Sequence, residues 1–372
     1  MSTPIPLSRP TAVVYCDHHF CRIDGKTANG LVRHSETYEV LSVIDSGQAG
    51  NDAGTLLDGH ANGIPVVASL QEALDLEVAR TGTRPDAMII GVAPSSGLLD
   101  AASRTVLLAA IAAGLDLVNG LHEFLNDDPE FAGAAIANEV EIRDIRRPRA
   151  TKDLRMFTGR IEEVTCPVIA VLGTDGAIGK RTTATILVDA LRDAGINAVM
   201  VSTGQTGLIQ GARFGIALDA IPAQFGIGEM EGVVLDAFRS ASPDVIIVEG
   251  QGALSHPAYI SSTIVLRGSR PDGVILQHAP GRTVLSDFPD VAMPTPDSEI
   301  ALIQAFADTT VIGMTINHER LSDDEISAAI VEFQRRLSIP VTDALTRPVE
   351  DLVTMVVTAF PTLRPLVPAG TG

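Results

Sequence analysis

The stretch PVIAVLGTDGAIGKRTTATILVDAL, at residues 167–191, constrains the fold of this chain more than any other feature. An apolar run leads into a glycine-rich turn that ends in Gly-Lys, and an amphipathic segment follows. This order predicts a strand, a phosphate-cradling loop and a helix. The loop N–H groups, the positive end of the helix dipole and the Lys180 ammonium would converge on one anion. We therefore expect a phosphate or diphosphate group to bind here.

The loop departs from the usual phosphate-loop pattern in two ways. Five residues separate Gly173 from Gly179 where four are usual, and Arg181 occupies the position of the hydroxyl residue that holds magnesium. The threonines that follow are displaced along the helix, and one helical position turns a side chain by about 100°. Phosphate binding is thus better supported than nucleotide hydrolysis. The predicted cofactor-binding residues are Gly173, Thr174, Asp175, Gly176, Gly179, Lys180, Arg181, Thr182 and Thr183.

Short apolar runs alternate with helical patterns along the whole chain, which predicts parallel sheets. Strands are expected at 38–46, 64–69, 86–93 and 115–120, and again at 167–173, 197–202, 244–250, 272–278 and 309–317. A charged, proline-bearing segment at 139–155 interrupts the alternation. The sequence therefore predicts an α/β chain with two domains, residues 1–150 and residues 151–372.

Composition limits the possible partners. The chain has 27 Lys and Arg against 46 Asp and Glu, and this net charge of −19 opposes binding to nucleic acid or to an anionic membrane. No apolar run approaches 18 residues and no signal-peptide pattern opens the chain. Three cysteines are too few for a disulfide framework. We expect a soluble cytoplasmic protein that acts on a small molecule.

Polar side chains follow the strands of the second half, where ligands gather in open parallel sheets. Glu249 ends one strand, and either holds a metal-bound water near the phosphate or organises its loop through hydrogen bonds. His256 and His278 lie just beyond two strands, and a neutral imidazole can accept a proton near pH 7. Arg282 directly follows the second histidine loop and is a candidate for binding substrate carboxylates or phosphates.

The first half offers weaker candidates. Cys16, His18, His19 and Cys21 lie within six residues, a spacing that strains tetrahedral zinc coordination, so no metal site is predicted. The turn that contains Lys26 and precedes Arg33 either faces an anionic substrate or is a simple surface turn. The segment SVIDSGQAGNDAG lacks G-x-G-x-x-G, and dinucleotide binding is not supported.

Several motifs resemble known families. GTDGAIGK followed by VEGQG is similar to the dethiobiotin synthetase group of phosphate-loop proteins. The set GKTANGLVR, VIDSGQAG, GTDGAIGKRTT, VEGQGALSHPAY and LQHAPGR resembles, over nearly the whole chain, a bacterial family of domains of unknown function that includes D-glutamate N-acetyltransferases. The resemblance implies a Rossmann-like parallel-sheet domain followed by an α/β domain like that of the P-loop NTPases.

The family resemblance also implies transfer of an acetyl group from acetyl-CoA to the amino group of D-glutamate, in D-amino acid catabolism. On this hypothesis, the 173–183 loop holds CoA phosphates, which require no hydrolytic magnesium. His278 is the expected general base and His256 the alternative, and Ser255 or backbone N–H groups would stabilise the oxyanion. Arg282, with Lys26 or Arg33 across an interdomain cleft, would bind substrate carboxylates, and Glu249 would also contact substrate.

Two other functions stay open at this point. In an ATP-dependent ligase or kinase, Lys180, Thr182 and Glu249 would bind Mg-ATP. In a nucleotide-sensing module, the loop would bind its ligand without catalysis. The sequence does not define the oligomeric state, and we expect a homo-oligomer.

Overall fold

The computed structural model describes residues 9–94 and 96–363. The chain divides into two compact units, Met1–Arg147 with Gln205–Gly211, and Pro148–Gly204 with Ala212–Gly372. The sequence-based boundary was placed after residue 150, within the segment 139–155. The sequence did not predict that Gln205–Gly211 belongs to the first unit.

The first unit contains a six-stranded parallel sheet with the order β3-β2-β1-β4-β5-β6. Its strands are β1 Thr11–Tyr15, β2 Glu39–Ile44, β3 Val66–Val67, β4 Ala87–Ile90, β5 Asp116–Asn119 and β6 Ile142–Asp144. Its α-helices are α1 Lys26–Arg33, α2 Ala53–Asp58, α3 Leu70–Thr81, α4 Ala101–Ala112, α5 Pro129–Asn138 and α7 Gln205–Gln210. The strand order reverses between β1 and β4, as in Rossmann-like folds.

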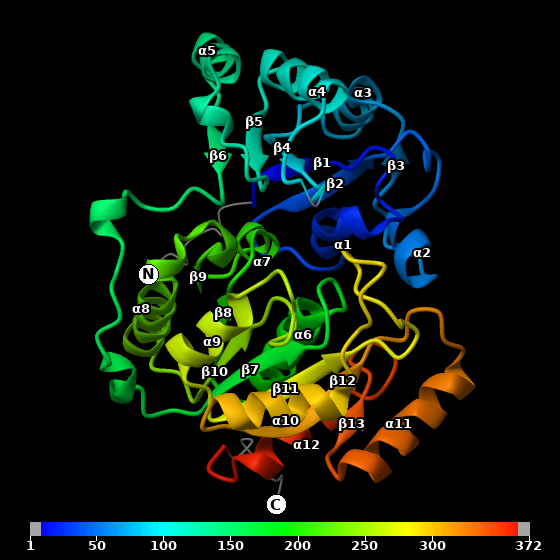
Figure 1. Ribbon diagram of the computed structural model, residues 1–372. Helices are drawn as coiled ribbons and strands as arrows, with labels where there is room; N and C mark the ends of the chain where they lie inside the picture. The colour runs from blue at the N-terminus through cyan, green and yellow to red at the C-terminus, as the bar shows by residue number, and fades with distance from the viewer. Residues whose placement is uncertain (1–8, 95, 364–372) are drawn as a thin grey trace, which may run out of the picture. The chain divides into compact units, whose positions relative to one another are not determined.

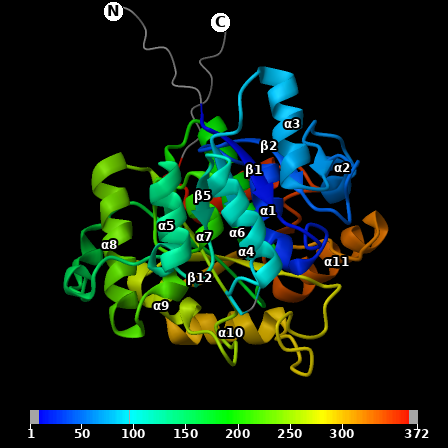
Figure 2. The same cartoon turned by 90° about the horizontal axis from the view of Figure 1, so that it is seen from above.

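Helices cover both faces of this sheet, with α3, α4 and α5 on one face and α1 on the other (Figures 1 and 2). The sequence predicts that α3 begins with a capping box, and Ser69 Oγ does accept a hydrogen bond from Glu72 N at 3.2 Å. The Glu72 carboxylate accepts one from Ala68 N rather than Ser69 N. Gly114 follows the last turn of α4 with φ +85°, which fits its predicted role as a helix stop.

The second unit contains a seven-stranded parallel sheet with the order β13-β12-β11-β7-β10-β8-β9. Its strands are β7 Val168–Gly173, β8 Ala198–Ser202, β9 Phe214–Gly215, β10 Val245–Glu249, β11 Gly273–His278, β12 Thr310–Ile316 and β13 Val341–Thr342. Its α-helices are α6 Lys180–Asp193, α8 Ala223–Ala241, α9 Ser261–Ser269, α10 Pro296–Phe306, α11 Asp323–Leu337 and α12 Glu350–Ala359.

Alternation along the strands divides the second unit into two cores. On β7, Val168, Ala170 and Leu172 pack with α8, α9, α10 and α11, whereas Ile169 and Val171 pack with α6 and α12. Because successive side chains point to opposite faces, a continuous apolar run marks a strand that is covered on both sides. β7 lies at the centre of the sheet, so its carboxyl end lies between the carboxyl ends of β11 and β10.

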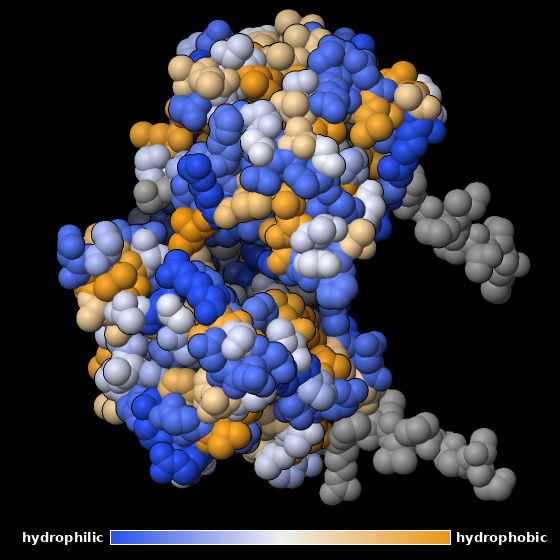
Figure 3. All heavy atoms as spheres, turned by 90° about the vertical axis from the view of Figure 1, so that its right-hand side faces the viewer, coloured by the Kyte–Doolittle hydropathy of each residue, from blue (hydrophilic) through white to orange (hydrophobic). Residues whose placement is uncertain are grey.

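One face of the molecule is mainly polar. On the face shown in Figure 3, hydrophilic residues predominate and apolar residues lie between them in small groups. Among the described residues, the helices are all too short or too polar to cross a membrane.

Candidate active site

The phosphate loop lies between β7 and α6 at the centre of the second sheet (Figure 1). At Gly173, an added Cβ would lie 2.8 Å from Ile178 Cδ1 and 2.9 Å from Gln277 O, so a larger residue does not fit. Gly179 precedes α6 with φ +103°, a conformation that favours glycine. The Lys180 ammonium donates to the carbonyl oxygen of Asp175 within the loop. The strand, loop and helix predicted from the sequence are all present.

The buried carboxylate of Asp175 stabilises the loop through hydrogen bonds. Asp175 is fully buried, and its Oδ1 accepts from Gly176 N at 2.6 Å while its Oδ2 accepts from Ser286 N at 2.9 Å. Arg282 Nη1 also lies 3.5 Å from Asp175 Oδ2. These three contacts to the Asp175 carboxylate hold the loop in place without a ligand.

Arg282 contacts this loop with the rest of its guanidinium. Its side chain is only 11% exposed. Nη1 and Nη2 donate to the carbonyl oxygens of Gly176 and Ala177 at 3.3 and 3.1 Å, and Nε donates to Glu319 at 2.9 Å. All three nitrogens therefore donate within the protein. A substrate-binding role for Arg282, as predicted from the sequence, would require some of these contacts to be given up.

The two threonines of the motif differ in position. Thr183 is buried, and its hydroxyl donates to Gln277 Oε1 at 2.7 Å, which directs it toward β11. Thr182 is partly buried in the first turn of α6. Arg181 is also partly buried, and its charge is the largest of the effects that lower the pKa of Glu249. Thr182 is thus the better candidate for the hydroxyl that the sequence motif lacks at its usual position.

Glu249 ends β10 next to this loop and is buried. Burial raises its pKa, and the charge of Arg181 and a hydrogen bond from Ser202 oppose this shift. Its Oε2 also accepts from Thr203 N at 3.1 Å, and its backbone oxygen accepts from Thr203 Oγ1 at 2.9 Å. These contacts match the loop-organising alternative for Glu249.

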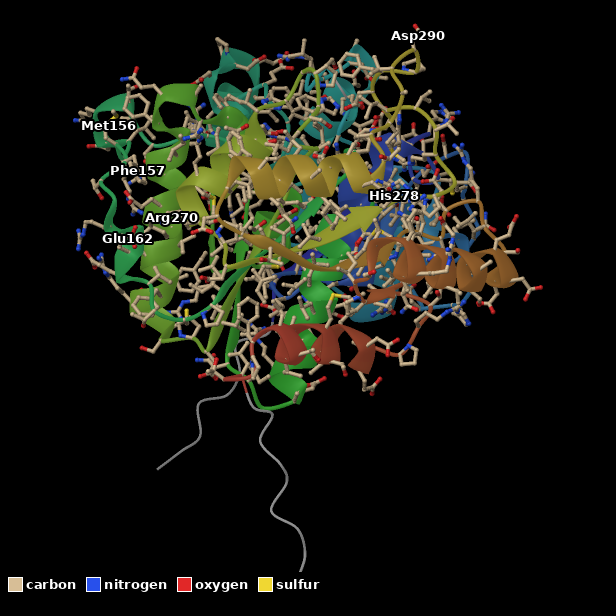
Figure 4. All side chains as sticks on the ribbon, turned by 60° about the horizontal axis from the view of Figure 1, so that its bottom comes forward. Met156, Phe157, Glu162, Arg270, His278 and Asp290 are labelled. Atoms are coloured by element: carbon tan, nitrogen blue, oxygen red, sulfur yellow. The ribbon has the colours of Figure 1, made fainter. Side chains whose placement is uncertain are left out.

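His278 is the last residue of β11 and is buried (Figure 4). Its Nδ1 lies 2.9 Å from Thr174 Oγ1 of the phosphate loop, and its ring meets Phe333 edge-on at 5.6 Å. Burial, assisted by the charge of Arg336, lowers its pKa to about 4. The imidazole is therefore neutral at pH 7 and directly coupled to the loop.

His256 and Ser255 lie in the segment between β10 and α9. Burial lowers the pKa of His256. The Ser255 hydroxyl donates to Glu299 Oε2 at 2.6 Å, and Glu299 is itself buried. A hydroxyl has one proton to donate. The predicted oxyanion contact by Ser255 would therefore require its bond to Glu299 to break.

The predicted residues of the first unit lie on α1. Lys26 is exposed at its first position. Arg33, at its last position, forms a two-pronged ion pair with Asp58, in which Nε and Nη2 lie 3.1 and 2.7 Å from Oδ1. The structure thus gives Arg33 a partner within its own unit, and its substrate role stays a prediction.

The Cys-His segment begins directly after β1. Cys16 is buried and Cys21 exposed, and both carry free thiols. His18, Asp17 and Asp45 instead place one potential ligand atom each within 4.8 Å of one another, at the ends of β1 and β2. The side chain of His18 is 66% exposed, and Asp17 already accepts two bonds from Ser46.

A histidine–aspartate pair at the same sheet edge was not among the predicted site residues. His318 Nδ1 lies 2.8 Å from Oδ2 of the buried Asp343, and the two residues follow β12 and β13. The neighbouring Asn317 donates to the loop carbonyl of Ile178 at 3.0 Å. A position shortly after a strand is the sequence signal that could have identified these two residues. For Asp343 this signal is weak, because β13 has only two residues and shows no clear apolar pattern in the sequence.

Two family models and two known enzymes are similar to this chain in sequence. The chain matches a Rossmann-like domain of unknown function, DUF1611_N, over residues 46–148, and a P-loop domain of unknown function, DUF1611_C, over residues 155–353. It is 33% identical over 262 residues to a D-glutamate N-acetyltransferase of Tritonibacter scottomollicae, which covers 69% of this chain and 76% of the relative. A D-glutamate N-acetyltransferase of a Pseudoalteromonas species is 29% identical over 299 residues, 78% of this chain and 87% of the relative.

A solved structure is similar over both units. The crystal structure of a DUF1611 family protein from Anabaena variabilis ATCC 29413, at 2.30 Å resolution, aligns with a TM-score of 0.86 at 28% identity. The alignment covers 94% of this chain and 100% of that chain. The predicted order of a Rossmann-like domain followed by a P-loop α/β domain is confirmed.

Proposed function

Because this chain belongs to the DUF1611 family, we propose that it transfers the acetyl group of acetyl-CoA to the amino group of D-glutamate. The observation that carries this proposal is the pair of relatives named D-glutamate N-acetyltransferase, which align over 69% and 78% of the chain. Acetyl-CoA is a cytoplasmic metabolite, so the reaction would take place in the cytoplasm as a step in D-amino acid catabolism.

The phosphate loop supplies the site for the acetyl donor. CoA carries a diphosphate and a further phosphate, and the start of α6 with Lys180 offers N–H groups and positive charge to such an anion. Gripping CoA requires no hydrolytic metal. A cation at Arg181 is then compatible with the reaction, whereas a nucleotidase would need a hydroxyl there.

The substrate nitrogen gives up two protons in the reaction. The α-ammonium of D-glutamate must lose the first before its nitrogen can attack the thioester carbonyl carbon. The nitrogen loses the second as the tetrahedral intermediate collapses to the amide and the C–S bond breaks. The departing thiolate takes up one proton to leave as the CoA thiol, and the other proton is released to solvent. We assign proton acceptance to His278, which is neutral at pH 7 because burial lowers its pKa to about 4. In this role Nδ1–H donates to Thr174 Oγ1, and the lone pair of Nε2 accepts the substrate proton.

The two carboxylates of glutamate also need partners. The cations proposed from the sequence are Arg282 with Lys26 or Arg33. Replacing Lys26 and Arg33 singly by Ala tests these two through KM for D-glutamate. A role for either predicts a higher KM for D-glutamate with an unchanged KM for acetyl-CoA.

An ATP-dependent ligase or kinase is the second candidate. It is favoured by Glu249, a buried carboxylate at the end of a strand that neighbours β7, together with Lys180. In such an enzyme Thr182 would have to provide the magnesium-binding hydroxyl.

One assay separates the two candidates. Purified protein is mixed with acetyl-CoA and D-glutamate, L-glutamate or D-aspartate in EDTA, and free thiol is followed; ATP and magnesium are then added to a parallel set. Acetyl transfer predicts thiol release with D-glutamate in EDTA. Formation of ADP or AMP with no thiol release in either set would instead assign the protein to the ligases or kinases.

A further inference from the structure

We propose that His256 binds the ligand of the phosphate loop as a hydrogen-bond donor, through Nε2–H, and accepts no proton in the reaction. The acceptor is an oxygen of the bound acyl donor, either a phosphate oxygen or the thioester carbonyl oxygen. The inference rests on the proposed function only for the identity of that donor as an acyl-CoA. It replaces the role of alternative base that the sequence suggested for His256.

The segment that carries His256 leaves β10 beside the end of β7. At Gly250, an added Cβ would lie 2.4 Å from the carbonyl oxygen of Val171, so only a glycine fits between the two backbones. Ser286 N donates to Asp175 of the phosphate loop, and Phe288, two residues further on, packs edge-on against the His256 ring. His256 therefore lies near the phosphate loop.

The ring is held rigidly in place. It stacks on Tyr259 at 4.3 Å with 15° between the planes, and Phe288 meets it edge-on at 5.7 Å. The Tyr259 hydroxyl is anchored in turn by Asp287 at 2.8 Å. Aromatic contacts on two sides restrict rotation of the imidazole, so its nitrogens keep fixed directions.

One backbone contact sets the tautomer. Nδ1 of His256 accepts a hydrogen bond from Ala258 N at 3.2 Å, so its lone pair is occupied and it carries no proton. Burial lowers the pKa of His256 and outweighs the opposite effect of Asp175 and Asp287, so the ring is neutral. A neutral imidazole with a bare Nδ1 carries its hydrogen on Nε2.

The Nε2–H group lacks a partner of its own. His256 is 7% exposed, and Nε2 is buried with no hydrogen-bond partner among the described residues. A buried donor left without an acceptor is costly, and native proteins satisfy nearly all such groups. A bound phosphate or thioester oxygen beside the loop supplies the missing acceptor.

The test uses two amides that differ in reach. The side-chain nitrogen of Gln lies near the position of His Nε2, and that of Asn lies near His Nδ1. Calorimetric titrations with acetyl-CoA and with CoA are carried out on the full-length wild type and on the variants H256Q, H256N and H256A. We expect H256A and H256N to bind acetyl-CoA about tenfold or more weakly, and H256Q to bind it within about threefold of wild type. H60A, which removes an exposed histidine of the first unit, serves as the matched control.

Turnover separates a donor from a base. An amide cannot take up a proton near pH 7, so a base would be lost in H256Q as completely as in H256A. Substantial activity of H256Q together with loss in H256A supports the donor, and equal loss in both overturns it. An equal loss of affinity for CoA and for acetyl-CoA in H256A places the acceptor on a phosphate, and a loss confined to acetyl-CoA places it on the thioester carbonyl.

Nitrogen NMR on the wild type keeps the inference testable if the variants fail to fold. We expect His256 as the Nε2–H tautomer, with a change at Nε2 when acetyl-CoA is added. An Nδ1–H tautomer, or no change at Nε2 at saturating acetyl-CoA, would overturn the inference. Because this experiment measures only binding of acetyl-CoA, its result stands even if no D-glutamate is acetylated. Acetylation of D-glutamate with an unperturbed His256 would overturn the inference and leave the proposed function intact.

Discussion

At the scale of single residues, the neutral state of His278 is the most consequential property of the site. If this imidazole accepts the substrate proton, replacing His278 with Ala should lower kcat by about 10²- to 10⁴-fold. Steady-state kinetics with acetyl-CoA and D-glutamate measures the effect, and unchanged CoA affinity is the control for an intact loop. Turnover within a few fold of wild type would remove His278 from the base role.

The buried His278 also makes stability depend on pH. In the unfolded chain its imidazole takes up a proton near pH 6.5, whereas in the native protein it does so only near the lowered pKa of about 4. Stability from this group is therefore complete above pH 6.5 and declines as pH falls toward 4. The loss amounts to about 3 kcal/mol. Urea unfolding of wild type and H278Q across this range should show a smaller decline in the variant, and parallel curves would contradict the assignment.

At the scale of elements, Arg282 has two candidate roles: it holds the phosphate loop in place, or it binds the substrate. If Arg282 holds the loop, replacing it with Ala should raise KM for acetyl-CoA about tenfold, through loss of its contacts to Gly176 and Ala177. Glu319→Gln should shift the same constant in the same direction, because Glu319 Oε2 accepts hydrogen bonds from Arg282 while its Oε1 pairs, among the described residues, only with the exposed Arg320. A rise confined to KM for D-glutamate would instead assign Arg282 to the substrate.

Elements with strong internal patterns were predictable from the sequence. The strands β7, β10 and β11 are buried on both faces and appear as continuous apolar runs. β6 was not predicted, because this edge strand has only three residues and lies inside the charged segment that was interpreted as the domain junction. The contacts of Arg282 and Ser255 were not predictable, since their partners Glu319 and Glu299 are set by tertiary packing and lie 37 and 44 residues away in sequence.

At the scale of the whole molecule, the chain crosses between its two units more than once. Residues 205–211 leave the second unit and join the first, where Gln210 Nε2 donates to the carbonyl oxygens of Gly30 and His34 at 2.8 Å each. Gln210 is buried, so Gln210→Ala should lower the free energy of unfolding by about 1–3 kcal/mol. Chemical denaturation measures this, with the exposed Gln71→Ala as control. An unchanged stability would show that α7 contributes little to the first unit.

The account as a whole depends on acetyl transfer at the phosphate loop. The most direct measurement incubates the protein with acetyl-CoA carrying ¹³C in its acetyl group and with D-glutamate in EDTA, and detects the product by NMR and mass spectrometry. We predict labelled N-acetyl-D-glutamate with wild type and a large loss of product with Lys180→Ala. No labelled product from folded wild-type protein that binds CoA would contradict the account.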